Sequence, residues 1–271
     1  MNIKSNSSPA EYILANERNI AAWLPYFGKL GECHLDNPPG VKRSLTHIPL
    51  ALFNSVMDSR LAPEAVDAAV QTILADARAW NVPLRWWIGP SSRPADLGKY
   101  LENYGFSLNE AETGMALDLA KLKEDLPAVA NFSIRLAQDE ADLQTWVQTL
   151  AAGNQVPATA QTFHQGWLDF MRSADQKAVL AYLGFLDGKP IATSLLFLDG
   201  DIAGIYAVAT VPEARQKGIG AWMTQRPLIQ ARSQGCRLGI LQASEMGLGI
   251  YRSLGFQECF KLVTYDWTPE N

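Results

Sequence analysis

The segment that most constrains this chain is a strand, a glycine-containing loop and a helix in immediate succession. A hydrophobic run ends at Pro212, and Arg215-Gln216-Lys217-Gly218-Ile219-Gly220 leads into a helix that stops at Gly235. The first turn of a helix has unpaired N–H groups and partial positive charge, and glycines allow an anionic group to approach the backbone closely. This succession predicts an α/β fold with an anion-binding loop, and an ordinary strand–helix connection is the alternative.

The spacing of the loop excludes two common nucleotide sites. It matches neither the GxGxxG of dinucleotide-binding folds nor the GxxxxGK[ST] of P-loops, and no Ser or Thr stands where a P-loop holds magnesium. Arg215 and Lys217 add full positive charges. A pyrophosphate therefore fits the loop better than a nucleoside triphosphate.

The residues before this loop predict two helices and an antiparallel meander. Residues 132–136 have the pattern of a strand, and 139–154 and 162–173 have that of helices. Three apolar runs follow, joined by Asp187-Gly188 and Asp199-Gly200, and Asp-Gly between apolar runs is a strong hairpin signal.

The first part of the chain has a similar mixture of elements. A helix is expected from Pro9, with a stop at Gly28 and Gly31, and residues 32–61 are expected to form short strands around turn residues such as Asn37, Pro38 and Pro39. A second helix begins at Pro63, with apolar positions at Val66, Val70, Ile73 and Ala77. We then expect a strand over 83–89, a helix over 94–104 and a strand through Leu117.

The charged stretch 119–131, which contains Pro127, interrupts both periodicities. We place a domain boundary there, which predicts one domain at 1–126 and a second at 127–271. The chain is long enough for two domains of ordinary size.

Composition excludes several kinds of partner. A net charge of −5 and a pI near 5.3 predict no nucleic-acid binding. The longest apolar run, 178–186, is shorter than the ~18–20 residues of a membrane span, and the polar N-terminus is no signal peptide. We therefore expect no membrane partner and a cytoplasmic location. The 3 cysteines form no CxxC pair, so neither a disulfide framework nor a metal site is predicted.

A second motif follows the glycine loop about 30 positions later, from Ser244 through Gly247 and Tyr251 to Phe256. Together, in this order, the two motifs resemble the GNAT superfamily of acetyl-CoA-dependent N-acetyltransferases. The resemblance covers the chain from about Phe132 to its end. It implies two GNAT-like domains of α+β type, each with a mixed, mostly antiparallel sheet flanked by helices.

The resemblance also implies a cofactor site between two splayed strands. Backbone groups of Val208, Ala209 and Thr210 would pair with the pantetheine of acetyl-CoA. The N–H groups from Gln216 to Ala221 would hold its pyrophosphate. The cofactor-binding residues expected on this basis are Val208, Ala209, Thr210, Arg215, Gln216, Lys217, Gly218, Ile219, Gly220, Ala221 and Ser244.

Tyr251 matches the tyrosine that acts in many members as general acid for the departing thiolate, and a positioned phenol can supply that proton. A tyrosine that only packs, like Ile250 and Phe256, is the alternative. Glu245 is the candidate base, with a surface glutamate or a water relay as alternatives. Ser244 and Gly247 replace the Asn and Ala that the family often has.

The first half repeats the second weakly. When Tyr104-Gly105-Phe106 is aligned with Leu254-Gly255-Phe256, Leu101 takes the place of Tyr251. No glycine loop precedes the helix at Pro63. These features predict a degenerate GNAT-like N-terminal domain that walls the acceptor pocket or mediates assembly. The alternative is a chance occurrence of Gly-Phe after a helix.

The function expected is transfer of the acetyl group of acetyl-CoA to a primary amine by direct attack, without a metal. The acceptor is a small molecule or peptide that the sequence does not identify, and a homodimer remains open. The alternatives are a non-catalytic acyl-CoA-binding regulatory protein and an acyltransferase that uses a longer acyl-CoA.

Overall fold

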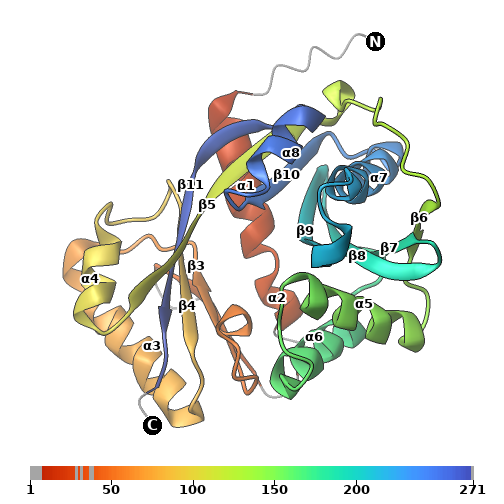
Figure 1. Cartoon of the computed structure of the whole chain (residues 1–271). Coiled ribbons are helices and arrows are strands. Elements are labelled where there is room, and N and C mark those ends of the chain that lie inside the picture. Colours follow the sequence, from red (N-terminus) through yellow and green to blue (C-terminus); the bar gives the residue numbers. More distant parts are fainter. Residues whose placement is uncertain (1–7, 28–29, 31–32, 37–39, 270–271) are drawn as a thin grey trace. The chain divides into compact units, whose positions relative to one another are not determined.

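The computed structural model describes residues 8–27, 30, 33–36 and 40–269. The predicted helix stop at Gly28 and Gly31, and the turn at Asn37, Pro38 and Pro39, lie outside these residues. The chain forms two compact units, each built from separate segments (Figure 1). Unit 1 contains the described residues of 1–19 and 114–259, and unit 2 contains those of 20–113 and 260–271.

These units do not coincide with the predicted division at 126/127. The chain passes between them near the end of helix α1 (Pro9–Ala21) and inside two long strands, β5 (Ser107–Asp118) and β11 (Gln257–Trp267). The segment 119–131 follows β5 and belongs to unit 1. Local composition could not reveal that each unit is built from two separated stretches of the chain. The break in periodicity at 119–131 marks the end of a strand and not the end of a domain.

Unit 1 contains the predicted meander. Its strands run in the order β11-β5-β10-β9-β8-β7-β6; β6 to β9 are antiparallel, and β10 is parallel to β9. At the β7–β8 hairpin Asp187 and Gly188 have φ values of 51° and 76°, as the Asp-Gly signal requires. The strands are β6 (Phe132–Leu136), β7 (Val179–Leu186), β8 (Lys189–Asp199), β9 (Ile202–Thr210) and β10 (Leu238–Ala243).

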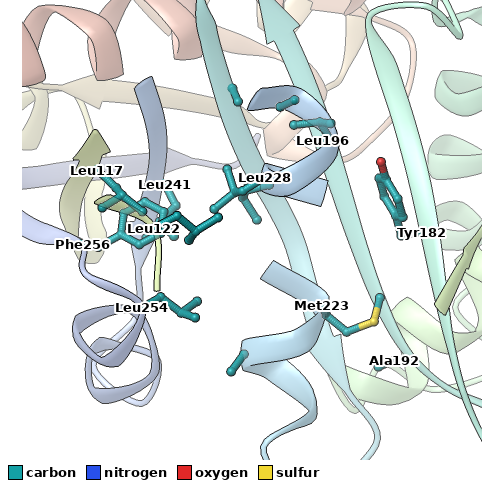
Figure 2. Packing of buried hydrophobic residues seen from close by; sticks show 14 of the residues in the cluster. Leu117, Leu122, Tyr182, Ala192, Leu196, Met223, Leu228, Leu241, Leu254 and Phe256 are labelled. Carbon is teal, nitrogen blue, oxygen red and sulfur yellow. The ribbon is translucent and has the colours of Figure 1, made fainter. Parts of the chain in front are cut away.

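Helices cover both faces of this sheet. Ala203, Ile205 and Leu241 lie in the core cluster with Met223 and Leu228 of α7, part of which is shown in Figure 2. The alternate residues Ile202, Leu238 and Ile240 pack with Tyr12 and Ala15 of α1, so α1 covers the opposite face. The helices are α1 (Pro9–Ala21), α5 (Glu140–Gly153), α6 (Gln161–Ser173), α7 (Ile219–Ser233) and α8 (Leu248–Leu254), with short 3₁₀ turns η3 (Leu119–Lys121) and η4 (Pro212–Ala214).

Unit 2 is also a mixed sheet with helices. Strands β1, β2 and β3 are antiparallel, β3 and β4 are parallel, and β4 and β11 are antiparallel. The predicted apolar stripe of α3 is confirmed, since Val66, Val70, Ile73 and Ala77 are buried in one cluster with strand residues such as Trp86. The elements are α2 (Leu24–Phe27), β1 (Cys33–Asp36), β2 (Lys42–Thr46), η1 (Ala51–Phe53), β3 (Ser55–Met57), η2 (Pro63–Ala65), α3 (Val66–Trp80), β4 (Leu84–Ile88) and α4 (Leu97–Asn103).

The molecule therefore has the mixed, mostly antiparallel α/β architecture that the sequence predicts. No helix among the described residues is long and apolar enough to cross a membrane.

Candidate active site

The central feature of unit 1 is a split between strands β9 and β10. The two strands pair at Leu238↔Ile202, Gly239↔Ala203 and Ile240↔Gly204. Beyond Gly204 and Ile240 both strands continue without pairing to each other. The N–H and C=O groups on the facing edges beyond this point are therefore not bonded across the two strands, and they can pair with an extended ligand.

A β-bulge in β9 follows the last paired residue. Leu195 lies opposite Tyr206 but Thr193 lies opposite Ala209, so β9 has one extra residue here. Ala207 has a φ of 48°, and its carbonyl accepts a 2.9 Å hydrogen bond from Thr193 Oγ1. A bulge increases the local twist of a strand. Beyond the bulge, Ala209 and Thr210 remain paired with Thr193 and Ala192 of β8.

The glycine loop lies between η4 and α7. Gln216 and Gly218 have φ values of 63° and 77°, and Gly218 is the N-cap of α7. Within the described chain, none of the N–H groups of residues 216–220 donates a hydrogen bond, and that of Ala221 donates to Gly218 O at 3.1 Å. Clustered free N–H groups at a helix N-terminus are a suitable site for a pyrophosphate.

The two glycines of the loop have different structural roles. A Cβ on Gly218 would meet nothing within 4 Å, so glycine is favoured there by the positive φ. A Cβ on Gly220 would lie 3.3 Å from Ile250 Cδ1 of α8. Gly220 therefore allows α8 to approach the first turn of α7.

Arg215 differs from its neighbours in the loop, because its guanidinium binds protein carbonyls. Nε donates to Thr210 O at 3.1 Å, and Nη2 donates to Gly153 O at 2.7 Å. Gly153 ends α5, and a cation is favourable near that helix terminus. Arg215 therefore has a structural role in addition to the role predicted for it in the cofactor site. The side chain of Lys217 is exposed.

The second motif forms a turn and the short helix α8. Tyr251 is partly buried, and its ring lies edge-on to that of Phe256 with centroids 6.1 Å apart. A Cβ on Gly247 would lie 2.8 Å from Tyr251 Cε2, so the tyrosine ring explains why glycine is required at this position. Ser244 and Glu245 are exposed, and neither side chain has a hydrogen-bond partner among the described residues.

Helix α1 also contributes to this part of unit 1, although the sequence predicts it in the other domain. Asn16 and Asn19 are fully buried and bond to Gln242 of β10 and Tyr206 of β9, next to the split. The available signal was the placement of two asparagines on the same helical face as Tyr12 and Ala15, where apolar residues are expected.

Unit 2 repeats the motif at α8 but lacks the glycine loop. The N–H groups of Gly105 and Phe106 donate to Glu102 O and Leu101 O, each at 3.1 Å. Gly255 and Phe256 make the same bonds to Arg252 O and Tyr251 O, also at 3.1 Å. The equivalence of Leu101 and Tyr251 in the predicted alignment therefore has a structural basis.

The two units share a further repeat, which was not predicted from the sequence. Both η2 and η4 read Pro-Glu-Ala, and each is followed by a helix of 15 residues. In unit 2 the helix begins directly at Val66, whereas in unit 1 residues 215–218 stand between η4 and Ile219. Unit 2 therefore lacks a counterpart of the loop that carries the free N–H groups.

The described residues contain no group of three or more His, Cys, Asp and Glu side chains that could hold a metal ion.

A split between parallel strands, a bulge in one of them and a glycine loop at the following helix define unit 1 as a GNAT-type α/β unit. Residues 133–259 match the family described as acetyltransferase (GNAT) domain, and this part of the chain belongs to that family. No curated protein is detectably similar to the chain in sequence.

Several solved structures share the fold over nearly the whole chain. A GCN5-related N-acetyltransferase from Kribbella flavida is 18% identical with a TM-score of 0.72, covering 94% of this chain and 96% of its own. A GCN5-related N-acetyltransferase from Sphaerobacter thermophilus is 16% identical with a TM-score of 0.62, and the match covers 98% of this chain and 95% of that protein. A tandem GNAT protein from the clavulanic acid biosynthesis pathway is 16% identical with a TM-score of 0.58, and the match covers 95% of this chain and 98% of that protein.

Proposed function

We propose that unit 1 transfers the acetyl group of acetyl-CoA to a primary amine of a small molecule or peptide. The observation that carries this proposal is the row of free N–H groups from Gln216 to Gly220, which begins α7 directly beyond the split between β9 and β10. A split strand edge suits an extended amide-containing chain, and the free N–H groups suit the pyrophosphate at its end.

In this proposal Val208, Ala209 and Thr210 offer backbone groups to the pantetheine. The amine nitrogen forms a bond to the thioester carbonyl carbon, the carbon–sulfur bond breaks, and the amine loses one proton. Tyr251 donates its hydroxyl proton to the departing thiolate and is reprotonated by that released proton. The packing of its ring against Phe256 and Gly247 would fix the direction of the hydroxyl.

In this proposal the proton of the amine passes to Glu245 or to water. Strand β9 carries no carboxylate, and Glu245 is exposed in the turn before α8. These two observations favour the second candidate function, a regulatory protein that binds an acyl-CoA without turning it over.

Unit 2 is proposed to be a GNAT-like unit without a cofactor site. This proposal is supported by the missing counterpart of residues 215–218 and by Leu101 at the position of Tyr251. A role for unit 2 in acceptor binding or assembly belongs to the same proposal.

The test uses the intact chain. Calorimetry with acetyl-CoA measures binding, and release of free thiol is then measured across a panel of amines, amino acids and peptides. Amine-dependent thiol release above the rate with water alone supports acetyl transfer. Binding with no stimulation by any amine supports the regulatory protein, and tighter binding of a longer acyl-CoA indicates a different donor. Absence of any binding contradicts both functions.

A further inference from the structure

The face of α1 that packs on unit 1 carries two buried asparagines. Asn16 and Asn19 are spaced by three residues and both are 0% exposed, beside Tyr12 and Ala15 of an apolar cluster. Asparagine is a weaker helix former than leucine or alanine, and burial of its amide is unfavourable unless the amide is hydrogen-bonded. Packing alone does not explain two asparagines at these positions.

Each asparagine bonds to a different strand of the split. Tyr206 on β9 donates its hydroxyl to Asn19 Oδ1 at 2.7 Å. Gln242 on β10 donates from Nε2 to Asn16 Oδ1 at 3.0 Å. The last paired residues of these strands are Gly204 and Ile240, so both bonds lie two positions further along, where the strands no longer pair.

The helix also lies directly against the point at which the strands separate. A Cβ on Gly204 would lie 2.1 Å from Asn19 Oδ1 and 2.5 Å from Tyr206 Cε2. The last paired residue of β9 therefore has no room for a side chain. Asn16 additionally donates from Nδ2 to Met115 O of β5 at 3.2 Å, which links the helix to the strand on the other side of β10.

Other contacts of α1 with unit 1 are of a more ordinary kind. Arg18 forms an ion pair with Asp199 at 3.0 Å, and Glu11 forms one with Arg237 at 2.5 Å. Exposed ion pairs of this sort contribute little to stability. They offer a natural control, because they attach the same helix to unit 1 without bonding to the separated parts of the strands.

A polar side chain is also left incompletely bonded at this place. Asn19 Nδ2 is buried and has no hydrogen-bond partner among the described residues. An unsatisfied buried donor is destabilising, so the helix is not optimised here for stability alone.

We infer that Asn16 and Asn19 are positioning residues that hold β9 and β10 in the separated arrangement required by the cofactor. This inference rests on the proposed acyl-CoA site. In the separated region the two strands cannot stabilise each other by pairing. Bonds from one rigid helix to Tyr206 and Gln242 replace part of that pairing and fix the distance between the strand edges.

The test compares Asn16→Ala, Asn19→Ala and the double variant with the control Arg18→Ala. Each of these variants loses contacts between α1 and unit 1, but only the asparagine variants lose hydrogen bonds to the separated parts of β9 and β10. At a temperature well below every melting point, we expect each single asparagine variant to raise the Kd for acetyl-CoA by about 3–10-fold and the double variant by more than 10-fold. Arg18→Ala should stay within about twofold of the unmodified chain.

Hydrogen exchange without ligand separates this inference from the proposed function. Amides of residues 205–210 and 241–243 should exchange faster in the asparagine variants, while Arg18→Ala leaves them unchanged. If the unmodified chain binds no acetyl-CoA, the proposed function fails, but the exchange rates still test the positioning. Unchanged exchange together with an unchanged Kd overturns the inference, even if the melting temperature falls.

The milder variants Tyr206→Phe and Gln242→Leu remove the same bonds from the strand side if an asparagine variant does not fold. We expect Asn19→Ala and Tyr206→Phe to be non-additive in their effect on exchange, because they remove one shared bond. Full additivity contradicts the inference.

Discussion

At the scale of single residues, small side chains and backbone angles shape the candidate site more than charges do. A Cβ on Gly247 would clash with the Tyr251 ring, and a Cβ on Gly204 would clash with Asn19, whereas a Cβ on Gly220 would make a tight contact with Ile250. The guanidinium of Arg215 binds two carbonyl oxygens. The chemistry proposed for the site therefore depends on backbone N–H groups and on one phenol.

Tyr251→Phe keeps the ring that packs on Phe256 and removes the hydroxyl. If the hydroxyl is the general acid, kcat should fall by roughly 10²–10⁴-fold while the Kd for acetyl-CoA stays within a few-fold. Tyr182→Phe is the control, because Tyr182 is buried and its hydroxyl bonds to Gln230 Oε1 at 2.7 Å. That variant should lose about 1 kcal/mol of stability and keep its turnover per folded molecule. A Tyr251→Phe variant with kcat within threefold of the unmodified chain would show that Tyr251 only packs.

Glu112 of unit 2 predicts a dependence of stability on pH. Burial and the nearby Glu110 raise the pKa of Glu112 from 4.5 to about 7, although Arg85 lowers it. Because the folded chain holds this proton more tightly than the unfolded chain, stability should decrease as pH rises from about 4.5 to 7. Glu112→Gln should remove this decrease and raise the free energy of unfolding at pH 8 by roughly 1–3 kcal/mol.

Urea unfolding between pH 4.5 and 8 measures this effect, and Glu110→Gln serves as the control because Glu110 is exposed. The control should change the slope less than Glu112→Gln does. Identical pH slopes for Glu112→Gln and the unmodified chain would show that Glu112 does not titrate in this range.

At the scale of elements, the loop before α7 distinguishes the two units. Both helices follow a Pro-Glu-Ala turn, and residues 215–218 are the insertion that leaves N–H groups free in unit 1. Without those residues α3 begins directly after its turn. One short insertion thus accounts for the difference in expected ligand binding between two helices of equal length.

Gly218→Leu tests the loop as an element. Gly218 and Gly188 have φ values of 77° and 76°, and a Cβ at either would meet nothing within 4 Å. Leucine should therefore cause similar backbone strain at both, about 1–2 kcal/mol. Only Gly218→Leu should abolish the rise in melting temperature caused by acetyl-CoA, since Gly188 lies in the β7–β8 hairpin. An undiminished rise in Gly218→Leu would place the cofactor elsewhere.

At the scale of the whole molecule, each compact unit is built from two stretches of the chain that are separated in sequence. Strand β4 pairs with β11 from Leu84↔Trp267 to Ile88↔Val263, although these residues are far apart in sequence. Helix α1 packs on the sheet of unit 1, whose strands other than β5 come from the second half of the chain. The two units are therefore not two consecutive pieces.

This arrangement predicts the behaviour of fragments. Residues 1–126 lack β11 and leave the edge of β4 unpaired, and residues 127–271 lack α1 and β5. Neither fragment should show a cooperative thermal transition by circular dichroism, and fragment 1–126 should aggregate through its exposed strand edge. The intact chain is the control. A cooperative transition in either fragment would mean that the exchanged strands are dispensable for folding.

Much of the local structure is determined by the sequence itself. The apolar stripe of α3, the Asp-Gly hairpin and the strand–loop–helix order around Gly218 depend on residues close together in the chain, so periodicity and turn chemistry reveal them. The resemblance of the two motifs to the GNAT superfamily was likewise contained in short segments. These parts of the fold were predicted correctly for that reason.

Only the tertiary structure decided which segments of the chain make up each unit. The pairing of β4 with β11 and the bonds from Asn16 and Asn19 to Gln242 and Tyr206 join residues that are distant in sequence. A strand pattern specifies an alternation of faces but not the partner at its edge, and a helical stripe does not specify which sheet it covers. The sequence therefore determined the elements, whereas long-range pairing and burial decided which elements surround the site.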